Sequence, residues 1–328
     1  MKMRKEIRAL SRDDMVKALG ALRAPAVMPH RNPDGDAIGS AVATVLYLRE
    51  RGIGATLLSP DGIPARLAFL AEGIPLTEGT PREIVTVDVA SLAQAGSGAA
   101  LIEGADTVLA IDHHALCTPF SLHYVRPEAA AVGEVLYDLF TEGGKGALTT
   151  AVATPLYAAS ASDTGSFRFR NVTPATLRVT AALLECGVDA PEISRRLFDI
   201  RTERELRAMA YAVMGTRSYY EGRLAVLSIS PSDLIEAGCE ESDFDAVIDL
   251  VRTRAGVEVA AVIRERRDGT VRLSIRTTGA DAASLCASFG GGGHRVAAGC
   301  TLPAKTAAEG LDIFLAEVHR LFPKDMER

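Results

Sequence analysis

Four short apolar runs near the start of the chain constrain the fold more than any other feature of the sequence. They are APAVMPH at 24–30, ATLLSP at 55–60, EIVTVDVA at 83–90 and TVLAIDHH at 107–114. The segment between the first two, 36–52, has its apolar residues at helical spacing and ends in a glycine. Short β-branched runs that alternate with helical segments are typical of βαβ units. We therefore predict an α/β fold with a parallel sheet in the N-terminal part.

The character of the sequence changes near residue 220. Residues 128–163 and 173–220 have helical patterns, and the charged stretch 191–215 is typical of a connecting helix. Beyond it, residues 257–278 form two apolar runs around Asp268-Gly269, a strong hairpin signal. We predict an N-terminal catalytic domain over 1–190, a helical linker over 191–219 and a smaller α/β domain over 220–328.

Composition restricts the class of protein. The 328 residues carry a net charge of −6, which argues against a broad basic face that holds duplex nucleic acid. No apolar run approaches the roughly 20 residues of a membrane span. The five cysteines form no C-x-x-C pair. We expect a cytoplasmic protein that does not contact membranes and that takes a small or short anionic substrate.

Acidic residues and histidines follow three of the four apolar runs. These side chains are His30, Asp34, Asp36, Asp88, Asp112, His113 and His114. Loops at the carboxyl ends of parallel strands converge on one crevice, so we expect the seven side chains to lie together. So many carboxylates would repel one another unless a cation lay among them. The sequence therefore predicts a metal centre.

Each part of this pattern also has an ordinary structural explanation. NPDGD is a good turn, Asp88 could cap the next segment, and D-H-H could be surface polarity. Their occurrence at three strand ends favours the metal. Imidazole and carboxylate without thiolate suit Mn²⁺, with Mg²⁺, Co²⁺ or Zn²⁺ as alternatives. Because the ligands exceed what one ion needs, we predict two ions.

Five motifs carry a resemblance to a known family. HRNPDGDAIGS, TVDVA, IDHH and SASDTGSFRF resemble the ordered motifs of the DHH phosphoesterase superfamily, and FGGGGHRVAAG resembles the signature of its DHH-associated C-terminal domain. The length and the two-domain layout are similar to the nanoRNase and pAp phosphatase (NrnA-like) branch. Inorganic pyrophosphatases of the related family have a basic motif where this chain has GGGGH.

The resemblance implies a role for each residue of the centre. One ion would be held by His30, Asp34 and Asp88, and the second by Asp36, Asp88, His113 and Asp163. Asp112 would orient a histidine, and His114 would face the substrate phosphate. These two would be catalytic residues that do not bind a metal ion. The loop after Asp163 would bring Ser166 and Arg168 toward the substrate, although Arg168 also suits an exposed position.

A glycine-rich loop marks the second domain. Four glycines at 290–293 could be a plain hairpin, but bare N–H groups there could also hold an anion. The resemblance implies that this loop binds the phosphate or terminal nucleotide of the substrate through Gly291, Gly292, Gly293, His294 and Arg295. Arginine suits phosphate contacts, so we add Arg276 and leave out Arg272, although a solvated strand face would explain both.

The resemblance implies an activity. A water molecule activated by two Mn²⁺ ions, or by Mg²⁺ or Co²⁺, would release nucleoside monophosphates from short single-stranded RNA and convert pAp to AMP. Two alternatives stay open. One is a cytoplasmic phosphodiesterase acting on cyclic or linear dinucleotides, and the other is a nucleotide-binding regulator without activity. The sequence also leaves a homodimer open.

Overall fold

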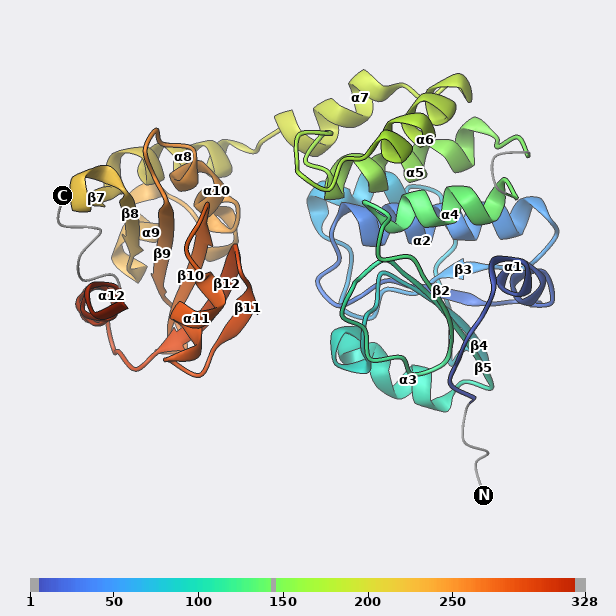
Figure 1. Cartoon of the computed structure of the whole chain (residues 1–328), viewed down its shortest axis with the longest axis horizontal. Coiled ribbons are helices and arrows are strands. Elements are labelled where there is room, and N and C mark those ends of the chain that lie inside the picture. Colours follow the sequence, from blue (N-terminus) through green and yellow to red (C-terminus); the bar gives the residue numbers. More distant parts are fainter. Residues whose placement is uncertain (1–5, 143–145, 322–328) are drawn as a thin grey trace. The chain divides into compact units, whose positions relative to one another are not determined.

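The chain folds into two compact units, Met1–Ile200 and Arg201–Arg328. The structure, a computed structural model, describes residues 6–142 and 146–321, without the side chains of His294, Arg320 and Leu321. Each unit has its own sheet (Figure 1). Each unit also has its own buried apolar core. None of the helices in the described ranges has the length and apolar character that a membrane span requires.

The first unit contains a six-stranded sheet in which every pairing is parallel, as the alternating apolar runs predicted. The strand order is β1-β6-β5-β4-β2-β3. The strands are β1 (Arg8–Ala9), β2 (Ala26–Met28), β3 (Thr56–Leu57), β4 (Glu83–Val87), β5 (Thr107–Asp112) and β6 (Leu122–Val125). The sequence pattern did not reveal β1 and β6, because two residues and a half-buried LHYV segment give no alternation to detect.

Helices cover both faces of this sheet (Figure 1). Successive side chains of a strand point to opposite faces. Val85 and Val87 of β4 accordingly join the core with the long helices, whereas Ile84 joins a smaller core with Ile102. The helices are α1 (Arg12–Gly20), α2 (Gly35–Glu50), α3 (Ala99–Gly104), α4 (Val132–Phe140), α5 (Thr150–Asp163), α6 (Pro174–Glu185) and α7 (Ala190–Ser194).

The direction of the strand order reverses at β2. From β2 the chain crosses through α2 to β3 on one side, and it then returns to β4 on the other side of β2. In an open parallel sheet the carboxyl ends of the strands at such a reversal are splayed apart and leave a crevice for ligands. The residues that follow β2 and β4 are therefore the first place to look for a site.

Helices α2 and α5 pack so closely that α2 needs a glycine at the contact. A Cβ on Gly39 would lie 2.5 Å from the Pro155 carbonyl oxygen. We expect Gly39→Ala to lower the free energy of unfolding by about 1–3 kcal/mol, the usual cost of overpacking. Urea denaturation followed by circular dichroism measures this. Gly20→Ala in α1, where nothing lies within 4 Å, is the matched control and should cost nothing. Equal stability of both variants would show that α5 can shift aside.

The second unit is built on a mixed sheet in the order β11-β12-β10-β9-β8-β7, in which only β8 and β9 are parallel. Arg266 and Thr270 close the predicted hairpin around Asp268-Gly269. The strands are β7 (Arg217–Tyr219), β8 (Leu224–Ile229), β9 (Val259–Glu265), β10 (Val271–Thr277), β11 (Gly292–His294) and β12 (Ala297–Leu302). The helices are α8 (Glu203–Gly215), α9 (Pro231–Ala237), α10 (Val247–Arg252), α11 (Ala282–Ala287) and α12 (Ala307–Leu321).

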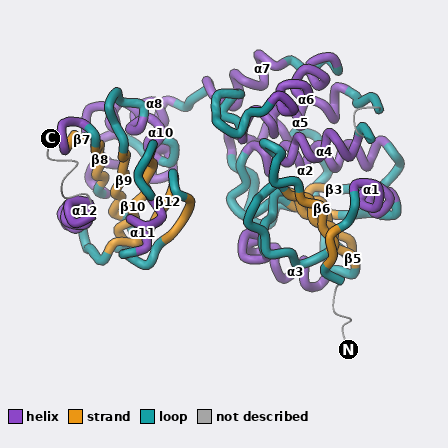
Figure 2. Tube along the Cα trace, viewed as in Figure 1, coloured by secondary structure: helices purple, strands orange, loops and turns teal. Residues whose placement is uncertain are grey.

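The helical prediction for 173–220 is wrong in two places. Residues 200–202 separate a π-helical segment, Arg195–Asp199, from α8, and Arg217–Tyr219 is an edge strand (Figure 2). The interruption has a local cause, because Thr202 and Glu205 form a capping box that begins α8 afresh. The stretch 191–215 is therefore not one connecting helix, and the boundary between the two compact units falls within it, after Ile200.

Candidate metal centre

The loop after β2 delivers His30 and Asp34 to the crevice. Asp34 is the N-cap of α2, where its Oδ1 accepts hydrogen bonds from the backbone N–H of Asp36 and Ala37, both at 3.0 Å. The turn explanation of NPDGD is therefore correct, and it is also what aims Asp34 at the crevice. The Nε2 atom of His30 lies 3.9 Å from Asp34 Oδ1.

Asp36 is fully buried and joins α2 to α4. Its Oδ2 accepts the Val132 N–H at 2.7 Å, and its Oδ1 accepts the Gly133 N–H at 3.1 Å and the Ser40 hydroxyl at 2.9 Å. Burial, together with the charges of Asp88 and Asp163, nevertheless raises the pKa of Asp36 well above its usual range. A nearby cation would offset that cost.

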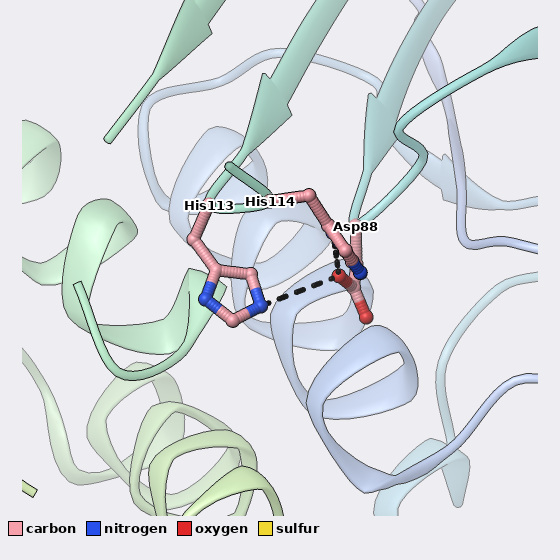
Figure 3. A group of neighbouring side chains, drawn as sticks. All are labelled: Asp88, His113 and His114. Carbon is pink, nitrogen blue, oxygen red and sulfur yellow. Dashed lines mark ion pairs between the residues drawn. The ribbon is translucent and has the colours of Figure 1, made fainter. Parts of the chain in front are cut away.

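Asp88 lies directly after β4 at the middle of the cluster. Its backbone is in the left-handed region (φ 61°), which is uncommon for a residue other than glycine, and 3% of the residue is exposed. Its Oδ1 has no hydrogen-bond partner among the described residues. Two imidazole nitrogens face that oxygen, His114 Nδ1 at 3.4 Å and His113 Nε2 at 3.8 Å (Figure 3). A buried, unpartnered carboxylate oxygen is what a metal ligand looks like without its ion.

Main-chain carbonyls fix the orientation of two imidazoles. His30 Nδ1 lies 2.8 Å from the Arg31 oxygen, and His113 Nδ1 lies 3.1 Å from the Ala129 oxygen. Each carbonyl can only accept, so Nδ1 carries a proton, and Nε2 is the atom that can bind an ion once the ring is neutral. Both Nε2 atoms face carboxylates, with His30 Nε2 3.4 Å from Asp88 Oδ2. This is the tautomer that metal-binding histidines use.

Asp112 organises the turn that follows β5. Its Oδ1 accepts the backbone N–H of His113 at 2.7 Å and of His114 at 3.1 Å, and it lies 2.8 Å from His114 Nδ1. Although burial opposes ionisation, the hydrogen bond from His114 lowers the pKa of Asp112. The same bond raises the pKa of His114 to about 9, so this imidazole is cationic near neutral pH in the metal-free protein.

Asp163, the last residue of α5, completes the cluster. Its Oδ2 lies 3.4 Å from His113 Nε2, and burial together with the charges of Asp34 and Asp88 raises its pKa to about 7. The Asn171 amide donates to the Asp163 and Ala130 carbonyls, both at 3.1 Å, and so ties this end of α5 to the segment before α4. Sequence reasoning missed Asn171, because no periodicity marks it.

The structure brings together all six predicted metal ligands. Three sets of side chains can each offer ligand atoms within 4.8 Å of one another, and Asp88 belongs to two of them. The sets are His30, Asp34 and Asp88; Asp36, His113 and Asp163; and Asp88, His113 and His114. The donor set of imidazoles and carboxylates fits a hard or borderline divalent ion.

A cavity of about 240 Å³ opens beside these ligands. Gln94 lines it, although no sequence pattern marked this residue, and its Oε1 accepts the Ala90 N–H at 2.7 Å. Ser166 and Arg168 are absent from its lining. Arg168 instead donates to the Gly165 carbonyl at 2.7 Å and stabilises its own turn, in which Ser166 has a φ of 59°.

Most glycines of the loop at 290–293 are required by the fold of the second unit. Gly290 and Gly293 have φ values of 70° and 149°, and a Cβ on Gly291 would collide with Cys300. Gly292 is different, since its φ is ordinary and a Cβ there would meet nothing within 4 Å. The side chain of His294 is outside the described part of the structure.

Strand register relates the other predicted substrate residues to this loop. Arg276 is paired with Ala297, which is paired in turn with residue 294, so these positions form one row across β10, β12 and β11. The Arg295 carbonyl accepts the Ala282 N–H at 2.8 Å, and Arg295 itself is exposed.

Comparison with known proteins agrees with this geometry. Residues 26–160 match the DHH family N-terminal domain, and residues 221–323 match the DHHA1 domain. The chain is 35% identical over 305 residues to the bifunctional oligoribonuclease and PAP phosphatase NrnA of Thermus thermophilus, covering 91% of this chain and 89% of the relative.

Two solved structures share the fold. An exopolyphosphatase-related protein from Bacteroides fragilis has a TM-score of 0.85 at 21% identity, covering 95% of this chain and 97% of the other. The exonuclease RecJ bound to manganese has a TM-score of 0.51 at 15% identity, with 99% and 97% covered. The chain belongs to the DHH family of phosphoesterases and is a hydrolase, as the sequence motifs predicted.

Proposed function

We propose that this protein is an oligoribonuclease and pAp phosphatase that works with two Mn²⁺ ions. The observation that carries the proposal is Asp88, whose unpartnered Oδ1 and second oxygen face two groups of ligands. One ion is assigned to His30, Asp34 and Asp88, and the other to Asp36, Asp88, His113 and Asp163. The names of the relatives support the substrates, and the manganese-bound relative supports the metal.

When bound, the ions supply Lewis-acid polarisation of the phosphate and lower the pKa of a nearby water molecule. The protein supplies the remaining groups. The Nδ1 atom of His114 lies 2.8 Å from Asp112 Oδ1, and a His114 imidazolium held there would neutralise charge on the phosphate oxygens. Asp112 accepts hydrogen bonds from the whole turn and keeps this cation in place.

We assign recognition of the terminal phosphate or nucleotide to Gly291, Gly292, Gly293, His294, Arg295 and Arg276. Gly292 gives the sharpest test, because nothing in the fold requires a glycine there. We expect Gly292→Ala to fold as stably as the wild type and to raise the KM for pAp about tenfold by blocking close approach of the phosphate. Gly279→Ala, also in open space, is the control and should change neither quantity. An unchanged KM in Gly292→Ala would remove the loop from substrate binding.

The function itself is tested by a comparison of rates. The full chain with Mn²⁺ is incubated with a 5′-phosphorylated RNA dinucleotide, a five-nucleotide RNA, pAp, a cyclic dinucleotide and pyrophosphate. We expect turnover of the short RNA and of pAp. Preference for the cyclic dinucleotide would make the protein a dinucleotide phosphodiesterase, and nucleotide binding without turnover would make it a regulator.

We further propose that the enzyme works in the cytoplasm. All five cysteines are free, which suits a reducing compartment. Light scattering of the purified chain will distinguish a monomer from the homodimer that the sequence left open.

A further inference from the structure

Two arginines of the second unit share one carboxylate at distances too long for hydrogen bonds. Arg252 ends α10, and its Nη2 lies 3.6 Å from Asp249 Oδ1. The Nε atom of Arg276 on β10 lies 4.0 Å from the same oxygen. In the same unit Arg264 and Asp245 approach to 2.8 Å, the normal length of a charge-assisted pair. Arg276 also donates from Nη1 to the Ile275 carbonyl at 3.2 Å. The cluster of Arg252, Arg276 and Asp249 therefore has excess positive charge, and the contacts of both arginines with the carboxylate are loose.

The fold does not use the donors of Arg252 fully. Its Nε is buried and has no hydrogen-bond partner among the described residues, although a buried guanidinium N–H normally finds one. The position at the C-terminus of a helix explains a positive charge there but not an unpartnered donor. The side chains of Arg252 and Arg276 keep 39% and 34% of their surface exposed, so a ligand can reach part of each, although the Nε of Arg252 is itself buried.

The cluster borders the glycine loop. The residue after Arg276 is Thr277, whose backbone N–H donates to the Val296 carbonyl at 2.9 Å and whose hydroxyl lies 3.3 Å from the Arg295 carbonyl. Arg276 is in the same cross-strand row as Ala297 and residue 294. Arg252 is thus joined, through Asp249 and Arg276, to the loop where we propose that substrate binds.

We propose that Arg252 and Arg276 together bind a phosphate monoester of the substrate, and that Asp249 occupies this position when no substrate is present. The inference rests on the proposed function for the identity of the substrate. Two guanidinium groups offer planar pairs of N–H donors that match phosphate oxygens. A phosphate dianion carries more charge than the exposed Asp249 carboxylate, so it displaces that carboxylate from both arginines.

Calorimetric titration of pAp into the metal-free full chain tests this inference. We expect Arg252→Gln to weaken binding about tenfold or more and Asp249→Asn to strengthen it. Arg272→Gln is the matched control, because Arg272 is an exposed arginine on the same strand as Arg276 and loses the same charge. Equal affinities of the Arg252 and Arg272 variants, weaker binding by Asp249→Asn, or no binding of pAp by the wild type would each overturn the inference.

Kinetics separate this inference from the proposed function. With Mn²⁺, Arg252→Gln should raise the KM for pAp and leave the hydrolysis of bis(4-nitrophenyl) phosphate unchanged, since that substrate has no phosphate monoester. A fall in both activities would overturn the inference. A wild-type chain that binds pAp through Arg252 but hydrolyses neither pAp nor RNA would contradict the proposed function and leave the phosphate site intact.

Discussion

Replacing Asp88 by asparagine is expected to abolish metal-dependent hydrolysis and to leave the fold intact. Asp88 is the residue that both proposed ions share, and partners outside the ligand shell already cost 10- to 100-fold when removed, so loss of the shared carboxylate should cost on the order of 10³-fold in kcat/KM. Asparagine tolerates the left-handed backbone found there (φ 61°). Asp88→Asn loses the attraction of the carboxylate to His30 and His114. It also removes the repulsion between this carboxylate and those of Asp36 and Asp163, which offsets the loss.

Thermal unfolding gives a readout of Asp88→Asn that does not depend on activity. A ligand that binds the native state raises the melting temperature. We expect Mn²⁺ to raise that of the wild type and not that of Asp88→Asn, whereas the two metal-free proteins should differ by at most about 1 kcal/mol in stability. Asp106→Asn, an exposed carboxylate paired with Arg82, is the control for the charge change. Full Mn²⁺ stabilisation of Asp88→Asn would contradict the shared-ligand assignment.

Replacing Asp36 by alanine is expected to destabilise the fold strongly, even without metal, whereas Asp88→Asn should leave the fold intact. The substitution leaves two amides and one hydroxyl without their acceptor in a fully buried position. Each buried unsatisfied group costs about 1–3 kcal/mol. Relief of repulsion among the carboxylates recovers part of this cost, because Asp36 has a raised pKa. We therefore expect a net loss of about 2–5 kcal/mol, measured by urea denaturation of the metal-free protein.

Asp34→Ala is the natural comparison for Asp36→Ala. Asp34 is also a proposed ligand, but it is 45% exposed and serves only as an N-cap, so its loss should cost about 1 kcal/mol. Asp36→Asn keeps one acceptor oxygen and should lie between the two. If Asp34→Ala and Asp36→Ala were equally stable, the hydrogen bonds of Asp36 to α4 would contribute nothing measurable to the free energy of unfolding.

The sequence was most informative where chemistry coincides with strand ends. His30, Asp88 and His113 were predictable, because each follows a buried parallel strand and such ends converge. The partners that orient them were not, since Arg31 and Ala129 contribute only main-chain oxygens, and no side-chain pattern reports a carbonyl. The break at 200–202 was missed because a capping box outweighed the helical periodicity around it.

The glycines at 290–293 were the least reliable indicator of a binding site in the sequence. Three of the four glycines at 290–293 are required by backbone conformation or by packing against β12, which a sequence cannot separate from ligand binding. Arg252 and Gln94 carried no signal at all, because an unpartnered atom or a place in a cavity wall is a property of the folded chain.

The main-chain carbonyls that hold the two imidazoles have a consequence for how this centre tolerates change. Residues 31 and 129 can be replaced by almost any amino acid without altering the tautomer of His30 or His113, because every residue offers the same oxygen. A shift of the backbone, in contrast, would disturb both histidines with no ligand substituted. Loss of metal affinity in this protein can therefore arise from insertions or deletions in these loops while all six proposed ligands remain in the sequence.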